Sequence, residues 1–217
     1  MKNVVEMIQS QEQRSILAIL QDERFYPVGD LAYMAGMSVK DTRGHIAELV
    51  GENIINTENN GRHSYYGIED TATAARVAEV LNSMPKPDIR PLKQDAKKSA
   101  VGDARTCYSH IAGELGVRLA ESLMEHGYIV KGEQEFNVTE KGESFFCDLG
   151  IVLPKKKGSR KCLDWTERRH HIAGSLGRTL LERFLEWGWI ERVSESRSLK
   201  VTNEGEKQLK RNFAIDI

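Results

Sequence analysis

Hydrophobic residues recur at helical spacing in two neighbouring runs within residues 28–50. A turn at Gly36-Met37 separates the runs, and the Ser38 side chain can cap the second one. The apolar positions that share one face are Leu31, Ala32, Met34 and Ala35 in the first run, then Val39, Ile46, Leu49 and Val50 in the second. This spacing predicts a helix-turn-helix.

The segment that follows has the pattern of a β-hairpin. A turn is expected at Asn59-Asn60-Gly61, because Asn and Gly tolerate positive φ. The apolar and aromatic positions on either side of that turn are Ile54, Ile55, Tyr65, Tyr66 and Ile68. A hairpin behind a helix-turn-helix predicts a wing.

These features resemble the winged-helix arsenic-repressor (ArsR) family of bacterial transcriptional regulators. The residues that carry the resemblance are Arg14–Leu20 as a first helix, Leu31-Ala32 and Ala35-Gly36 around the turn, Ser38, Gly61-Arg62-His63, and Tyr65-Tyr66. It covers about residues 10 to 84. The resemblance implies a homodimeric transcriptional repressor that binds double-stranded DNA. It also implies that a helix over Asp70–Met84 completes the dimer interface.

The expected DNA-contacting residues lie on the second helix and on the wing. A recognition helix in the major groove presents its outward side chains to base edges and phosphates, and Arg43 is the best candidate for guanine. The helix positions are Ser38, Lys40, Thr42, Arg43 and His45, and the wing positions are Arg62 and His63. The alternative is that these residues form an ordinary solvated face.

The rest of the chain contains an internal repeat. His110-Ile111-Ala112-Gly113-x-Leu115-Gly116 recurs as His171-Ile172-Ala173-Gly174-x-Leu176-Gly177. Both motifs are expected inside helices, so that each copy forms a helix, a hairpin and a second helix. We therefore predict a mainly α fold with small β-hairpins (α+β). Residues 1–84 would form the winged helix-turn-helix and dimerisation domain, 85–103 a proline-containing linker, and 104–217 a pseudo-symmetric sensor with repeats at about 104–150 and 160–213.

Metal sensing is one hypothesis for the sensor. The Cys-x-Cys site common in the resembled family is absent between Met37 and His45, and its acidic and His site on the last dimer helix is absent too. The Cys-x-x-His spacing would put Cys107 and His110 on one helical face, and head-to-head packing of the copies could add Cys162 and His171. Such a set suits zinc or another soft divalent cation. The alternatives are paired structural histidines, or a thiol redox switch at Cys107.

A small organic inducer is the hypothesis that the sequence favours over metal. An apolar pocket between the copies could be lined by Tyr108, Trp165, Phe184, Trp187 and Trp189. The residues assigned to effector binding are Cys107, His110, Trp165, Arg168 and His171. Core packing explains most of these aromatic residues equally well.

The composition of the chain narrows its possible DNA contacts, location and function class. Lys and Arg total 31 against 32 Asp and Glu, with acidic residues in excess up to Ile68 and basic residues concentrated in the last third. We therefore expect the C-terminal part either to share the phosphate contacts or to carry them at a second site. The sequence lacks a signal peptide, a long apolar run and catalytic motifs, which predicts a cytoplasmic protein that is neither membrane-bound nor an enzyme. The three cysteines are expected to be reduced, with Cys147 buried.

Overall fold

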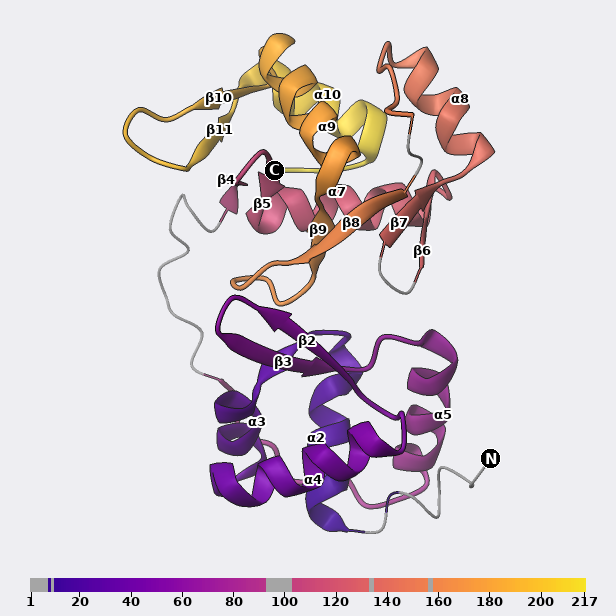
Figure 1. Ribbon diagram of the computed structural model, residues 1–217, viewed down its shortest axis with the longest axis vertical. Coiled ribbons are helices and arrows are strands. Elements are labelled where there is room, and N and C mark those ends of the chain that lie inside the picture. Colours follow the sequence, from indigo (N-terminus) through magenta and orange to yellow (C-terminus); the bar gives the residue numbers. More distant parts are fainter. Residues whose placement is uncertain (1–7, 9, 93–102, 133–134, 156–157) are drawn as a thin grey trace. The chain divides into compact units, whose positions relative to one another are not determined.

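The computed structural model describes residues 8, 10–92, 103–132, 135–155 and 158–217. The chain divides into two compact units, Met1–Ala96 and Lys97–Ile217, coloured indigo to purple and pink to yellow in Figure 1. Helices and small sheets occur in both, so the predicted α+β class is confirmed. Residues 85–92 have no helix or strand, and the rest of the expected linker, up to residue 102, lies outside the described residues. Within the described residues, no helix is long and apolar enough to cross a membrane.

The N-terminal unit contains the predicted helix-turn-helix and hairpin. Its described elements are α2 (Gln11–Ile19), η1 (Leu20–Asp22), β1 (Tyr26–Pro27), α3 (Val28–Ala35), α4 (Val39–Gly51), β2 (Asn56–Asn60), β3 (His63–Gly67) and α5 (Thr71–Asn82). The strands pair antiparallel in the order β1-β3-β2. Asn60 pairs with His63, so the tip of the hairpin is Gly61-Arg62, one residue later than the sequence suggested.

Local chemistry explains where the two central helices end and begin. Gly36 adopts φ 69°, a left-handed conformation that ends α3 and favours glycine. The Ser38 hydroxyl then accepts a hydrogen bond from the Asp41 backbone N–H and so caps α4. Ile16, Leu31 and Leu49 are buried among the helices. The burial of these side chains fixes one face of α4 against the other helices and leaves its opposite face exposed to solvent.

The C-terminal unit passes twice through the order hairpin, helix, hairpin, helix. The first half contains β4 (Arg105–Cys107), β5 (His110–Ala112), α7 (Gly113–Glu125), β6 (Ile129–Lys131), β7 (Glu135–Val138) and α8 (Glu140–Asp148). The second half contains β8 (Gly158–Leu163), β9 (His170–Ile172), α9 (Gly174–Glu186), β10 (Ile190–Arg192), β11 (Leu199–Val201) and α10 (Asn203–Phe213). Buried apolar side chains from both halves form one core.

The repeated His-Ile pair lies in a strand in each half, so the assignment of the motif to a helix was wrong. His110–Ala112 pairs antiparallel with β4, and His170–Ile172 pairs with β8. Gly113 and Gly174 then adopt φ values of 78° and 72°. This left-handed conformation is not helical, so neither helix can extend to earlier residues. The helices α7 and α9 therefore begin at these glycines.

The helices pack across the two halves. In the C-terminal unit α7 lies against β9, and α9 lies against β5. Gly116 on α7 faces His171, and Gly177 on α9 faces His110; a Cβ added to them would stand 3.4 and 3.0 Å from those histidine Cβ atoms. The missing side chains therefore let each helix approach the strand that carries the other half's histidine.

Candidate metal centre and DNA-binding face

Two short hairpins each place a cysteine directly opposite a histidine. Cys107 pairs with His110 across β4 and β5, and Cys162 pairs with His171 across β8 and β9. Opposite residues in antiparallel strands present their side chains on the same face, with Cβ atoms close together. The predicted arrangement of Cys107 and His110 on one helical face was therefore wrong, because cross-strand pairing brings them together instead.

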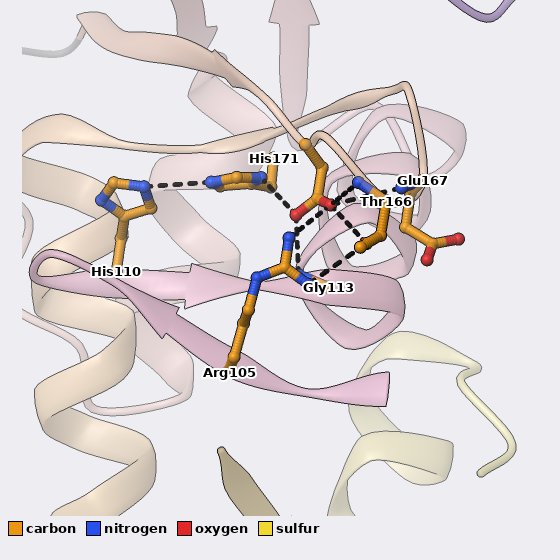
Figure 2. A network of polar contacts seen from close by, with 7 residues as sticks. Arg105, His110, Gly113, Thr166, Glu167 and His171 are labelled. Atoms are coloured by element: carbon orange, nitrogen blue, oxygen red, sulfur yellow. Dashed lines mark hydrogen bonds and ion pairs between the residues drawn. The ribbon is translucent and has the colours of Figure 1, made fainter. Parts of the chain in front are cut away.

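These four residues, called the Cys–His cluster below, form one compact group. One ligand atom from each of Cys107, His110, Cys162 and His171 lies within 4.8 Å of all the others. The two histidines are buried and the two cysteines are half-buried. The Nε2 atoms of His110 and His171 are 3.0 Å apart, and Figure 2 shows the two ring edges facing each other.

The donor set fits a soft or borderline divalent cation. Two thiolates and two imidazoles are the Cys₂His₂ set of tetrahedral zinc, with bonds of about 2.0–2.1 Å to nitrogen and about 2.3 Å to sulfur. Such bonds give edges of about 3.3–3.8 Å between ligand atoms. Since the ligand atoms of the Cys–His cluster lie within 4.8 Å of one another, small side-chain movements suffice to hold zinc.

The environment of Cys107 favours the thiolate form that a metal requires. Hydrogen bonds from Cys162, His110 and His171 lower the pKa of the Cys107 thiol to about 2, against the opposing effect of burial. At neutral pH this sulfur is therefore a thiolate, the form that both coordinates metals and acts as a nucleophile.

A buried carboxylate stands behind His171. Asp164, with a fully buried side chain, is an ion-pair partner of Arg105, whose Nη2 lies 2.6 Å from its Oδ1. Its Oδ2 accepts a hydrogen bond from the backbone N–H of Gly113 and lies 3.2 Å from Nδ1 of His171. The backbone N–H groups of Thr166 and Glu167 donate to Oδ1. Figure 2 shows these partners, called the Asp164 network below, converging from both halves of the unit.

The charges around His171 and Asp164 affect the protonation of these two side chains. Burial opposes the charged form of His171, but the Asp164 carboxylate and the Cys107 thiolate raise the pKa of the ring. Burial also opposes ionisation of Asp164, yet hydrogen bonds from His171, Thr166 and the Gly113 backbone, together with the Arg105 charge, hold the pKa of Asp164 far below its usual range. Asp164 is consequently ionised at any ordinary pH.

Neither Asp164 nor Arg105 is among the residues predicted from the sequence to bind a metal or an effector. One available signal was an Arg-x-Cys motif, which occurs as Arg105-Thr106-Cys107 and again as Arg160-Lys161-Cys162. It would have aligned the two cysteines as equivalent positions. Asp164 has no counterpart in the first hairpin, where Tyr108 and Ser109 alone connect the strands.

The aromatic residues expected around an effector lie in different surroundings. Trp165 is 56% exposed, with the Arg105 guanidinium 5.2 Å from its ring centre, and Tyr108 is 96% exposed. Phe184, Trp187 and Trp189 pack against one another in the core. Arg168 is half-buried in the β8–β9 loop, where it adopts φ 60°. Cys147 was predicted to be buried but is exposed.

On α4, three of the five residues expected on the DNA-binding face are exposed. Ser38, Lys40 and Arg43 are exposed. Thr42 is fully buried, and its hydroxyl donates to the Ser38 carbonyl. Its assignment to the outward face was wrong, because Thr42 precedes Ile46 by four residues and so belongs to the buried stripe.

The acidic side chains of α4 have partners within the unit. Asp41 accepts a hydrogen bond from the Ser38 hydroxyl, and Glu48 accepts one from Gln13. His45 is half-buried and lies 3.6 Å from Glu48. On the wing, Arg62 and His63 are exposed near the hairpin tip. The exposed cations of this unit thus include Lys40, Arg43 and Arg62.

Comparison with known proteins gives one relative that matches nearly the whole chain. It is the "Uncharacterized HTH-type transcriptional regulator YdfF" of Bacillus subtilis (strain 168), which is 38% identical over 208 residues, or 94% of this chain and 92% of the relative. Among solved structures, reduced HlyU from Vibrio cholerae N16961 matches with 19% identity and a TM-score of 0.34 over 38% of this chain and 86% of that one. No family model matches. The extent and identity of the first match place the chain in the same family of helix-turn-helix transcriptional regulators as YdfF.

Proposed function

We propose that this regulator is a homodimeric repressor of the ArsR type, whose C-terminal unit binds zinc or a similar thiophilic divalent cation as its signal. The observation that carries the metal assignment is the convergence of Cys107, His110, Cys162 and His171 within 4.8 Å. Four such donors, two of them buried, form a set that metal sites use and that a purely apolar core avoids. Metal therefore replaces the small organic inducer as the first hypothesis.

The DNA-binding part of the proposal rests on α4 and the wing. Lys40 and Arg43 are exposed on a helix that follows a helix-turn-helix turn, and Arg62 is exposed at the hairpin tip. In this proposal Arg43 reads a base in the major groove, while Ser38 and Lys40 contact phosphates. Two copies of the chain would bind half-sites about one helical turn apart.

A gel-shift series tests the DNA face with the full-length protein and the promoter of its own gene. Arg43→Ala should weaken binding by about 5- to 150-fold, the effect expected for losing one base-reading arginine. Arg24→Ala is the matched control, because Arg24 is an exposed arginine of the same unit that lies outside α4 and the wing. Equal affinities of the two variants would remove α4 from the proposal.

Metal analysis of the full-length protein, purified without chelator, tests the sensor. We expect one zinc ion per chain in the wild type and none in the double variant Cys107→Ser, Cys162→Ser. Cys147→Ser is the control, since Cys147 is an exposed thiol outside the Cys–His cluster. Metal removal should then change the promoter affinity of the wild type by about 5- to 150-fold. A bound metal with unchanged promoter affinity would make the site structural and refute metal sensing.

A thiol switch at the same site is the second candidate, favoured by the Cys107 thiolate beside Cys162. In that case a disulfide oxidant would change promoter affinity in protein stripped of metal, and a reductant would restore it. Metal addition alone would leave affinity unchanged. The two candidates thus predict opposite results in the same gel-shift assay.

We also propose that the C-terminal unit arose by internal duplication. Its halves have the same order of elements, and each begins with Arg-x-Cys on one strand and His-Ile-Ala-Gly at the end of the next. In this interpretation the ancestral half supplied one cysteine and one histidine. Two halves, related by pseudo-symmetry within residues 104–217, then complete a four-ligand site.

A further inference from the structure

The two hairpins of the Cys–His cluster differ in one chemical respect. Only the second one carries a buried carboxylate behind its histidine, since Asp164 lies in the β8–β9 loop with its Oδ2 atom 3.2 Å from Nδ1 of His171. Metal-bound imidazoles commonly donate their second ring N–H to such a carboxylate, which fixes the tautomer and the ring orientation. This difference between the two hairpins therefore affects a ligand of the proposed metal site.

We propose that Asp164 is a positioning residue for the metal, holding His171 with a proton on Nδ1 and the Nε2 lone pair directed into the Cys–His cluster. This inference rests on the proposed metal-binding function. An ionised carboxylate accepts hydrogen bonds and cannot donate them, so the nitrogen that faces it must carry a proton. The opposite nitrogen of a neutral ring is then free to bind a cation.

The contact between the two histidines agrees with this assignment. Their Nε2 atoms are 3.0 Å apart, a distance at which one must donate a hydrogen bond and the other accept it. With the proton of His171 on Nδ1, His110 is the donor. For both Nε2 atoms to bind a cation, His110 would have to carry its proton on Nδ1, a change of tautomer that releases no proton.

The carboxylate is held in place by partners that do not belong to the Cys–His cluster. Arg105 and the Thr166 hydroxyl bind Oδ1, while the backbone N–H at the start of α7 binds Oδ2. The side chain of Asp164 is 0% exposed. Nδ1 of His171 is buried and lacks a well-aligned hydrogen bond at its 3.2 Å separation from Asp164.

The test compares metal affinities in the full-length protein, using Co²⁺ as a spectroscopic probe and Zn²⁺ by competition. Asp164→Asn should weaken Zn²⁺ binding by about 10- to 100-fold, the usual effect of losing such a partner. Glu121→Gln is the matched control, because it also converts an arginine-paired carboxylate of the unit to an amide, at the Arg169 ion pair. Equal Zn²⁺ affinities for Asp164→Asn and the control would overturn the inference. Failure of the wild type to bind either metal would instead refute the proposed function.

A second measurement needs no variant, and so it holds even if Asp164→Asn fails to fold. Nitrogen-15 NMR of the histidine rings in the wild type reports which nitrogen carries a proton and which binds metal. We expect His171 to keep a proton on Nδ1 with and without Zn²⁺, and to bind Zn²⁺ through Nε2. Coordination through Nδ1, or a metal-free ring protonated on Nε2 alone, would overturn the inference.

Discussion

The hairpins β4–β5 and β8–β9 reach the same arrangement from different sequences. In the first, two residues connect Cys107 to His110, and in the second, eight residues connect Cys162 to His171. In both hairpins the cysteine and the histidine are nevertheless paired in register. Antiparallel pairing, and not the number of intervening residues, therefore brings the cysteine and the histidine of each hairpin together.

The difference in loop length has a chemical consequence. A two-residue connection closes the first hairpin tightly, with Tyr108 at φ 56°. The longer connection of the second hairpin leaves room for Asp164, which folds inward and binds Arg105 from the first half. In the proposed metal site, one hairpin thus supplies ligands alone, whereas the other also supplies the residue proposed to orient one of them.

The largest predicted effect tests whether the two hairpins contribute equally to metal binding. Cys107→Ser and Cys162→Ser, made singly, should each weaken Zn²⁺ binding by more than the roughly 10- to 100-fold expected for a residue behind a ligand. Each change removes one of four direct bonds, so the two losses should be similar. Competition with a chromophoric chelator measures both. Loss in one variant alone would show that a single hairpin holds the metal.

A smaller effect is expected at the Cys107 thiol when no metal is bound. The hydrogen bond from Cys162 helps to lower the pKa of Cys107 to about 2, so Cys107 is a thiolate at every pH above that value. Its alkylation rate should stay nearly constant from pH 8 to pH 6. An ordinary thiol, with a pKa of about 8.5, should slow by tens of fold over the same range. Peptide mass spectrometry after timed alkylation, with free cysteine as reference, measures both rates; a parallel decline for Cys107 would contradict the thiolate assignment.

Sequence reasoning succeeded where the deciding interactions are local. The helix-turn-helix depends on a Ser38 cap, a Gly36 turn and an apolar stripe, all visible within a few residues. It failed where pairing across strands decides, as in the three-residue His-Ile-Ala segment, which is too short for periodicity to separate strand from helix. The four residues of the Cys–His cluster were predicted to come together, but from an arrangement of helices that does not exist.

Other residues show why part of the site could not be predicted. Asp164 is one acidic residue in a polar loop, and its burial depends on Arg105, which is far away in the sequence. Thr42, in contrast, was predictable, since its spacing from Ile46 and Leu49 places it on the buried face of α4. The error came from counting Thr42 among the outward residues instead of applying the helical period.

The tight packing near the start of α7 and α9 can be tested at two glycines. Gly116→Ala and Gly177→Ala should each destabilise the protein by about 1–3 kcal/mol, as overpacking of a tight interior does. The added Cβ atoms would overlap the carbonyl oxygens of Ile111 and Ile172, which are backbone atoms of the strand that precedes each helix in the same half, and would also press on the histidine Cβ atoms of the other half. Urea unfolding measures the loss. Gly29→Ala in α3 is the control, because nothing lies within 4 Å of its added Cβ, and an equal response at all three glycines would contradict the close packing.

The smallest predicted effect asks whether the two halves are energetically as well as structurally alike. Thr139 caps α8 by accepting the Gly142 N–H at 3.0 Å, and its hydroxyl donates to the Gly127 carbonyl at 2.7 Å. Thr202 caps α10 through the same two contacts, to Gly205 and Gly188, at the same distances. Replacing either threonine with alanine should therefore cost about 1 kcal/mol in urea unfolding. If the two costs differ by much more than the roughly 0.3–0.5 kcal/mol scatter of independent sites, the halves have diverged in stability despite their matching contacts.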